Sequence, residues 1–287
     1  MARRLFCSLC PAAYRLSVWT ERCLRRIADG LSRHRLARER QDVLLPVVIC
    51  THKSLIRRRL GNTRMDLQEN KAVNLALAAP CVSGVLIRPG ETFSFWSLVG
   101  NPTAARGFRT GLTVSSGETG EGVGGGLCQF TNLIHWMVLH TPLTVVEHHH
   151  HDGVDLFPDF NRQVPFGTGT SIFYNYLDYR FRNDTDRVFQ IVVYVTDTYL
   201  CGEIRSTSPL PVKYHIVAEG ERFVRRDGQV YRRGQVFRTC IDKRTGGTLL
   251  RELLRDNDAR VLYDTTHLEV VDETVDYTPP CAVRNEG

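Results

Sequence analysis

The sequence of 287 residues has no apolar run long enough to cross a lipid bilayer. Its longest uninterrupted apolar stretches, such as 43–50, are about eight residues, whereas a membrane-spanning helix needs roughly 20. The first residues also make a poor secretory signal, because the apolar stretch after Arg4 is broken by Pro11 and followed closely by Arg15. We therefore expect no transmembrane helix and a cytoplasmic protein.

Signatures of structural zinc sites and of nucleic-acid binding are missing as well. The nine cysteines match no closed zinc pattern, and no nucleic-acid motif accompanies the basic residues. In a reducing cytosol, scattered cysteines serve mostly as small hydrophobic residues. We expect no nucleic-acid partner.

Positive charge is concentrated at the N-terminus. Residues 1–64 contain 15 Lys or Arg and 4 Asp or Glu, a net charge of +11, which leaves 22 basic and 27 acidic residues, a net charge of −5, for the remainder. Apolar residues such as Leu16, Trp19 and Ile27 recur at helical spacing within 16–36, with arginines between them, and predict an amphipathic helix. The segment is either a solvated helical face or a peripheral contact with an anionic membrane.

A glycine-rich stretch leads to Cys128. Its glycines are Gly117, Gly120, Gly122, Gly124, Gly125 and Gly126. Glycine is used where the backbone takes a positive φ or approaches another group closely, so we expect a shaped loop here rather than packing. The apolar segment 130–139 then predicts a buried helix with Cys128 at its start. The positive end of that helix would lower the pKa of the Cys128 thiol.

Four consecutive histidines lie in segment 143–151, whose composition predicts a strand. Because successive side chains of a strand point to opposite faces, His148 and His150 would share one face. His149 and His151 would share the other.

A nucleophilic Cys128 would need a base from outside its own helix. His135 lies on the same helical stripe but about 10 Å further along the axis, which is too far for direct proton transfer. We therefore expect His148 or His150 to act as base and acid, with N–H groups of the glycine loop as an oxyanion hole.

The candidate catalytic residues are Cys128, Glu147, His148 and His150. The candidate ligand-binding residues are Gly124, Gly125, Gly126, Gln129, Asp152 and Arg162. Asp152, Asp155 or Asp159 could orient an imidazole. Three alternatives stay open: a packed cysteine beside solvated histidines, a binding site without turnover, and a zinc site made by Cys128, two histidines and an acid.

The whole pattern predicts an α+β fold. We expect basic N-terminal helices in 1–54, a β-rich core with one buried helix in 55–205, a small β-rich region in 206–278, and a tail in 279–287. Within the core, a helix over 67–79 should stop at Pro80, and segments 164–182 and 188–196 should pair as a hairpin.

Five segments together resemble the VanW family. They are Arg-Pro-Gly-Glu-Thr-Phe-Ser-Phe at 88–95, Gly-Gly-Gly-Leu-Cys-Gln at 124–129, Val-Glu-His-His-His-His at 146–151, Pro-Phe-Gly-Thr-Gly at 165–169 and Asp-Tyr-Arg-Phe-Arg-Asn-Asp-Thr-Asp at 178–186. The resemblance covers roughly 55–200, and His148 stands where the family usually has arginine. It implies a bacterial protein associated with vancomycin resistance and, by inference, with peptidoglycan.

The resemblance implies no particular reaction. It is compatible with a thiol-dependent hydrolase or transferase that acts on a peptide-like cell-wall precursor. It is equally compatible with a protein that binds a ligand or partner without turnover.

Overall fold

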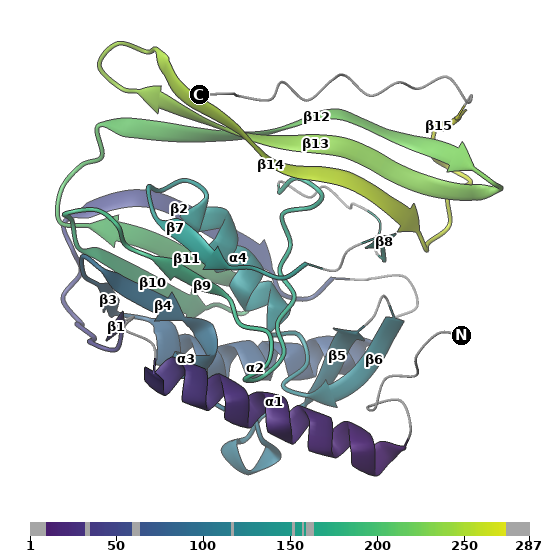
Figure 1. Ribbon diagram of the computed structural model, residues 1–287, viewed down its shortest axis with the longest axis horizontal. Helices are drawn as coiled ribbons and strands as arrows, with labels where there is room; N and C mark the ends of the chain where they lie inside the picture. Colours follow the sequence, from purple (N-terminus) through teal and green to yellow (C-terminus); the bar gives the residue numbers. More distant parts are fainter. Residues whose placement is uncertain are drawn as a thin grey trace.

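The computed structural model describes residues 10–31, 35–58, 64–115, 118–150, 153–156, 158 and 164–273. A body of two small sheets and several helices lies beneath a sheet of long C-terminal strands (Figure 1). This arrangement confirms the α+β class with a β-rich centre. The tail expected in 279–287 lies outside the described residues. In the part of the chain that is described, no helix is both long and apolar enough to span a membrane.

The first sheet has four antiparallel strands in the order β2–β11–β10–β3. Their bounds are Val47–Leu55 (β2), Tyr199–Ser206 (β11), Phe189–Val195 (β10) and Val85–Ile87 (β3). Helices α2 (Met65–Val82) and α4 (Cys128–Val138) pack against it. Gly202 of β11 permits this contact, because a Cβ there would lie 2.6 Å from the terminal methyl of Met137 and 2.8 Å from Leu133.

The second sheet has the order β1–β4–β9–β7. Its strands are Arg35–Leu36 (β1), Glu91–Ser94 (β4), Arg180–Arg182 (β9) and Thr144–Glu147 (β7). The rings of Phe93 and Phe181 stack across β4 and β9 with centroids 4.7 Å apart, inside a large core cluster that both sheets share. The two sheets therefore enclose a common core.

The elements between β4 and α4 form the lower edge of the body in Figure 1. They are α3 (Phe95–Val99), a short 3-10 helix (Ala104–Arg106), and the hairpin of β5 (Thr110–Ser115) and β6 (Glu118–Val123). The first half of the glycine-rich stretch is thus a strand. The shaped turn is confined to 124–127, between β6 and α4.

The C-terminal region is the β-rich unit that the sequence predicts. Its sheet has the order β15–β12–β13–β14–β8. The strands are Val212–Arg226 (β12), Gln229–Asp242 (β13), Thr248–Val261 (β14), Val270–Asp272 (β15) and Val154–Asp155 (β8). Arg238 of β13 joins this sheet to the body, since its guanidinium donates to the carbonyl oxygens of Leu139, at 2.8 Å, and Thr141.

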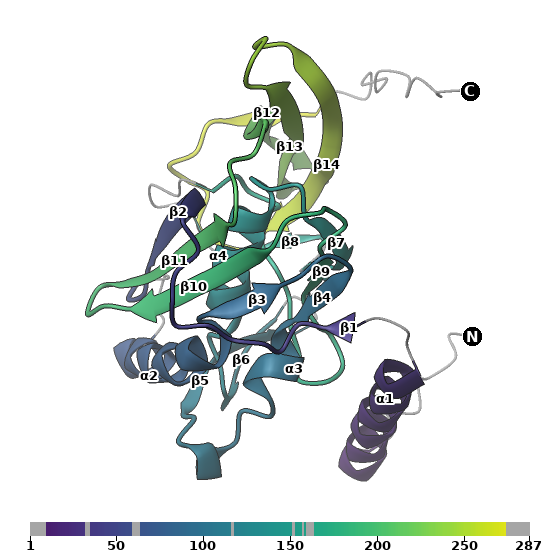
Figure 2. The same cartoon turned by 90° about the vertical axis from the view of Figure 1, so that its left-hand side faces the viewer.

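The N-terminal region divides into two parts. Helix α1 (Pro11–Leu31) lies at the side of the body (Figure 2), whereas residues 35–55 run through the body itself. Ala37 is buried and its N–H donates to the carbonyl of Thr92 at 2.9 Å. The domain boundary expected at residue 54 therefore falls inside β2.

Helix α2 continues through Pro80 to Val82, so the expected stop at the proline is wrong. The proline lies in the last turn, where carbonyl groups lack partners within the helix. The side chain of Arg40 supplies them, donating to the carbonyls of Pro80, at 2.9 Å, and Cys81.

The hairpin expected between 164–182 and 188–196 is also wrong. β9 pairs with β4 and β7, whereas β10 pairs with β3 and β11 in the other sheet. Asn183 lies at the crossing, and its amide donates to the carbonyls of Ile87 (2.8 Å) and Arg187 (2.7 Å). These bonds turn the chain from one sheet to the other, which propensity alone does not indicate.

Candidate functional site

Cys128 is the first residue of α4, as predicted, and its side chain is half-buried. Burial raises the pKa of its thiol, although hydrogen bonds from the N–H of Ile172 and from its own N–H act in the opposite direction. The expected lowering of this pKa is therefore wrong in direction. The loss of hydration outweighs the helix terminus, because burial disfavours the charged thiolate.

The glycine turn before Cys128 packs closely against the protein itself. A Cβ on Gly125 would collide with the carbonyl of Gly111 in β5, and one on Gly126 would collide with the stem of Lys71 in α2. A Cβ on Gly124 would lie 2.7 Å from the Cβ of Pro102. The close approach that these glycines permit is thus to neighbouring chain segments.

Backbone groups of the turn are also engaged internally. The N–H groups of Gly124 and Gly125 donate to the carbonyls of Arg109 and Gly122, each at 3.0 Å. The amide of Asn74 donates to the carbonyl of Gly125 at 2.9 Å. These two N–H groups are therefore committed and do not form the oxyanion hole expected from the sequence.

The segment 168–172 crosses the start of α4 and is fastened to it. Asn132, one turn beyond Cys128, accepts bonds from the N–H (2.6 Å) and the hydroxyl (2.8 Å) of Thr170. The hydroxyl of Thr131 also contacts that of Thr170 and donates to the carbonyl of Cys128 at 3.1 Å. These bonds hold the crossing segment over the thiol, where the N–H of Ile172 reaches it.

His148 and His150 lie on the same side as this stripe of α4. The ring of His148 stacks on that of His135, with centroids 4.2 Å apart, and its Nε2–H donates to the carbonyl of Gly169 at 2.8 Å. A Cβ on Gly169 would lie 3.9 Å from Nε2 of His150 and 3.8 Å from Oδ1 of Asn132. Segment 168–172 therefore contacts the start of α4 at Cys128 and also the two histidines, and these groups form one neighbourhood.

His135 forms the buried floor of the cluster. Its Nδ1 lies 3.0 Å from the hydroxyl of Tyr179, which is fully buried. Burial lowers the pKa of His135 well below its ordinary value, and the nearby His148 and His150 add to that effect. His135 is therefore neutral at physiological pH, and so is the Cys128 thiol.

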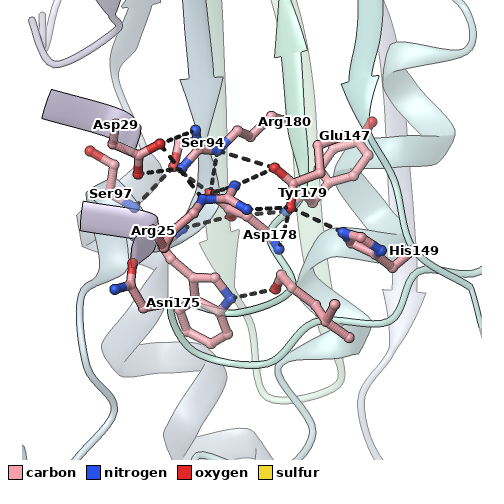
Figure 3. Close-up of polar contacts among 12 residues, drawn as sticks. Arg25, Asp29, Ser94, Ser97, Glu147, His149, Asn175, Asp178, Tyr179 and Arg180 are labelled. Carbon is pink, nitrogen blue, oxygen red and sulfur yellow. Dashed lines mark hydrogen bonds and ion pairs between the residues drawn. The ribbon is translucent and has the colours of Figure 1, made fainter. Parts of the chain in front are cut away.

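Glu147 and His149 face a different group of residues (Figure 3). The Glu147 carboxylate pairs with Arg25 of α1, accepts from Nε2 of His149 at 3.0 Å, and accepts from the N–H of Asp178 at 2.9 Å. Burial acts to raise the pKa of Glu147, but the bonds from Arg25, Asp178 and His149 together lower it. This carboxylate is engaged in holding α1 to the body.

The chain is similar to known proteins over the region that contains this neighbourhood. The family model described as VanW-like protein matches residues 70–205. The chain is 37% identical over 204 residues to the vancomycin B-type resistance protein VanW of Enterococcus faecalis (strain ATCC 700802 / V583), an alignment that covers 70% of this chain and 74% of that protein. The chain belongs to the family of VanW-like proteins.

A second relative of this VanW-like chain is the uncharacterized protein YoaR of Bacillus subtilis (strain 168). The two are 30% identical over 118 residues, which is 40% of this chain and 36% of YoaR. No solved structure matches the chain. The matched range 70–205 contains the whole Cys128 and histidine neighbourhood, whereas β12–β15 lie beyond it.

The remaining candidate ligand-binding residues of this VanW-like protein are Gln129, Asp152 and Arg162. The amide of Gln129 donates to the hydroxyl of Ser54 (2.9 Å) and to the carbonyl of Leu55 (2.8 Å), both in β2. Asp152 and Arg162 lie outside the described residues. Within the ranges that are described, no group of three or more His, Cys, Asp and Glu residues has a geometry that could hold a metal ion.

Sequence reasoning missed the crossing segment 168–172 and Tyr179. The available signal is the Pro-Phe-Gly-Thr-Gly run at 165–169, which falls within the first arm of the expected hairpin, 164–182. Gly167 within it has φ of +90°, and a Cβ there would clash with the side chain of Asn257 in β14. The run is a shaped loop that leads into the segment whose Ile172 N–H reaches the thiol.

Proposed function

We propose that this VanW-like protein acts in vancomycin resistance by binding a peptide-like cell-wall precursor at the neighbourhood of Cys128, Asn132, His148 and His150. The observation that carries the proposal is the convergence of three separate segments, 128–135, 148–150 and 168–172, on one partly exposed place. The relative VanW of Enterococcus faecalis is named for B-type vancomycin resistance, which supports the biological setting.

The electrostatics of the neighbourhood favour binding a neutral, polar ligand. Burial keeps both the Cys128 thiol and the His135 ring uncharged. Imidazole and amide side chains supply donors and acceptors in fixed directions, which suits peptide N–H and C=O groups. A peptide backbone would be recognised through such groups without the desolvation of a full charge.

A second candidate is a thiol-dependent hydrolase or transferase acting on the same precursor. The observation that favours it is the position of Cys128 at the start of α4, on the stripe that the histidines cover. In that mechanism His148 or His150 would take the thiol proton as substrate arrives, and the thiolate would add to a carbonyl carbon. The same histidine would return the proton to the leaving amine or alcohol as its bond to that carbon breaks, which leaves a thioester for water or an acceptor to cleave. The raised pKa of the thiol makes this the weaker of the two proposals.

A cytoplasmic location belongs to the same proposal. The seven cysteines that the structure describes are free thiols, as is usual in a reducing compartment. A cell-wall precursor that is assembled inside the cell would be accessible there.

The test is calorimetric titration of the full chain with a soluble muropeptide, followed by mass spectrometry of the mixture. Binding should weaken about tenfold or more in the double variant His148→Gln/His150→Gln, which loses two hydrogen-bonding rings. The matched control is His149→Gln, which faces Glu147 and should bind normally.

Cys128→Ala separates the two candidates. If the protein only binds, this variant retains affinity and the muropeptide is recovered unchanged. If it is a thiol enzyme, the wild-type chain yields a new product that Cys128→Ala does not form. Absence of both binding and product in the wild-type chain would refute the proposed function.

A further inference from the structure

Helix α1 turns its apolar side toward solvent. The large apolar residues that recur along this side are all exposed: Leu16 (52%), Trp19 (63%), Leu24 (54%), Ile27 (57%) and Leu31 (80%). An amphipathic helix of a soluble domain normally buries this stripe against the core. Contiguous exposed apolar residues of this size mark an interaction surface.

The opposite, polar side of α1 is what docks on the body. Two bonds of 2.7 and 2.8 Å join Asp29 to the guanidinium of Arg180. The amide of Asn175 donates to the carbonyl of Arg22 at 2.8 Å, and Arg25 makes the ion pair with Glu147 described above. At about 100° per residue, positions 22, 25 and 29 fall opposite the exposed stripe. The docking contacts therefore fix the apolar side outward.

Charge identifies the occupant of that side. No acidic residue lies within the stripe itself. The exposed Arg26 borders it beside Trp19, and the exposed Glu21 borders it beside Leu24. The chain continues from the helix to the exposed Arg35 and Arg38, within an N-terminal region of net charge +11 over residues 1–64. An anionic lipid surface complements this charge, whereas a second copy of the same face would bring like charges together.

We propose that the exposed side of α1 inserts into the interface of an anionic membrane and holds the VanW-like domain at the bilayer surface. The exposed residues extend from Leu16 to Leu31, so the stripe runs for roughly 22 Å parallel to the membrane plane. Trp19 lies within the stripe, and indole rings prefer the boundary between headgroups and acyl chains. Apolar burial and attraction of arginines to anionic lipid act together in such helices.

The experiment is flotation of the full chain with vesicles of phosphatidylcholine containing about 30% phosphatidylglycerol, compared with pure phosphatidylcholine vesicles. The wild-type protein should float with the anionic vesicles, and raising the salt to about 0.5 M should weaken the binding by screening. The double variant Trp19→Ser/Ile27→Ser should lose vesicle affinity about tenfold or more.

The matched control is Leu249→Ser/Leu253→Ser on β14, where the exposed fractions are 60% and 50%. These side chains are as exposed as those of α1 but lie on the C-terminal sheet, so the control should float like the wild-type chain. Both variants should keep the wild-type unfolding temperature, because they change exposed side chains. A blue shift of tryptophan emission on vesicle binding should disappear in Trp19→Phe.

Two results would overturn the proposal. One is the absence of flotation of the wild-type chain with anionic vesicles. The other is a dimer in solution that Trp19→Ser/Ile27→Ser converts to a monomer, which would assign the surface to a second copy. Neither result depends on whether the protein binds muropeptides.

Discussion

The two sides of the segment 147–150 differ in their electrostatics. His148 and His150 lie beside the buried His135 and Gly169, whereas Glu147 and His149 face charged groups from α1 and β9. The strand expected over 143–151 ends at Glu147 in β7, yet the side chains of 147–150 still alternate in direction and so serve two environments. The difference separates a region suited to a neutral ligand from a region that positions the N-terminal helix.

The charged side, which consists of Glu147, His149 and the groups they contact, has the carboxylate of Asp178 at its centre. Asp178 is buried and accepts from the hydroxyl of Ser94 at 2.5 Å, the N–H of Trp96 at 3.1 Å and the guanidinium of Arg180 at 2.7 Å. Ser94 is also the N-cap of α3, so the same network fixes the start of that helix. The neutral side has no comparable charge among the groups described above, and its contacts are rings, amides and hydroxyls.

The largest expected effect comes from breaking the charged side. Asp178→Ala removes the acceptor of several buried donors and should lower the free energy of unfolding by about 3–5 kcal/mol, because those groups stay buried without a partner. Urea unfolding measures the change. Asp186→Ala is the control, since that carboxylate is 86% exposed in its ion pair with Arg187 and should cost less than about 1 kcal/mol. A loss below 1 kcal/mol for Asp178→Ala would show that the network is not cooperative.

The next effect concerns the turn beneath the neutral side. Gly125→Ala places a methyl group against the Gly111 carbonyl and should cost about 3 kcal/mol, because a backbone group cannot move away easily. Gly90→Ala is the matched control. Its φ of +78° is strained for alanine but no atom lies within 4 Å, so the expected cost is about 1 kcal/mol. Equal costs for both variants in urea unfolding would mean that the close contact in the turn relaxes freely.

Acid should weaken the two sides in different pH windows. The pKa of His135 in the folded protein is lower than its ordinary value of 6.5, so the unfolded chain binds more protons and stability falls as the pH drops below about 6.5. One such group contributes at most about 1.4 kcal/mol per pH unit. Glu147 and Asp29 also have lowered pKa values. Because they are carboxylates, their contribution to the stability of the folded protein is lost only as the pH falls below their ordinary pKa values, about 4.5 and 3.8.

Unfolding temperatures of the wild-type chain and His135→Gln between pH 7 and pH 5 test this difference. The variant should show a smaller decrease, because it lacks the titrating ring. Other histidines with lowered pKa values contribute equally to both proteins and cancel in the comparison; one is His52, whose pKa is lowered to about 4 chiefly by its partial burial. An identical pH dependence of the two proteins would mean that His135 binds its proton as readily in the folded protein as in the unfolded chain.

The smallest structural effect is expected at Cys128. Cys128→Ser should change the free energy of unfolding by about 1 kcal/mol or less, because the site is half-buried and the replacement is nearly isosteric. Alkylation by iodoacetamide at pH 7.5, followed by mass spectrometry, should label the exposed Cys10 about tenfold or more faster than Cys128. Faster labelling of Cys128 would show a reactive thiolate and would favour the enzyme candidate.

Local patterns predicted the elements around the site well. The apolar run 130–139 predicted α4, the alternation of the histidines predicted that His148 and His150 lie together, and the turn signals after 211 predicted the C-terminal sheet. The pairing of strands was predicted less well. β9 and β10 are neighbours in sequence yet belong to different sheets, because Asn183 bonds to residues of β3 and of its own turn.

The candidate site was predicted only in part. Sequence spacing identified Cys128 and the histidine pair, but it did not indicate the crossing segment that brings Ile172 to the thiol. It also assigned Glu147 to catalysis, whereas the structure engages this carboxylate with Arg25, which is 122 positions away in the chain. Contacts between residues so far apart in the chain leave no periodic pattern in the sequence.

The sequence by itself determined the start of α4 at Cys128, the alternation along 147–150 and the amphipathic character of α1, because these depend on residues one to seven positions apart. Only the tertiary structure decided the direction of the Cys128 pKa, the partner of Glu147 and the outward orientation of the apolar side of α1. Desolvation and charge pairing depend on which distant segments surround a group, and folding alone brings those segments together.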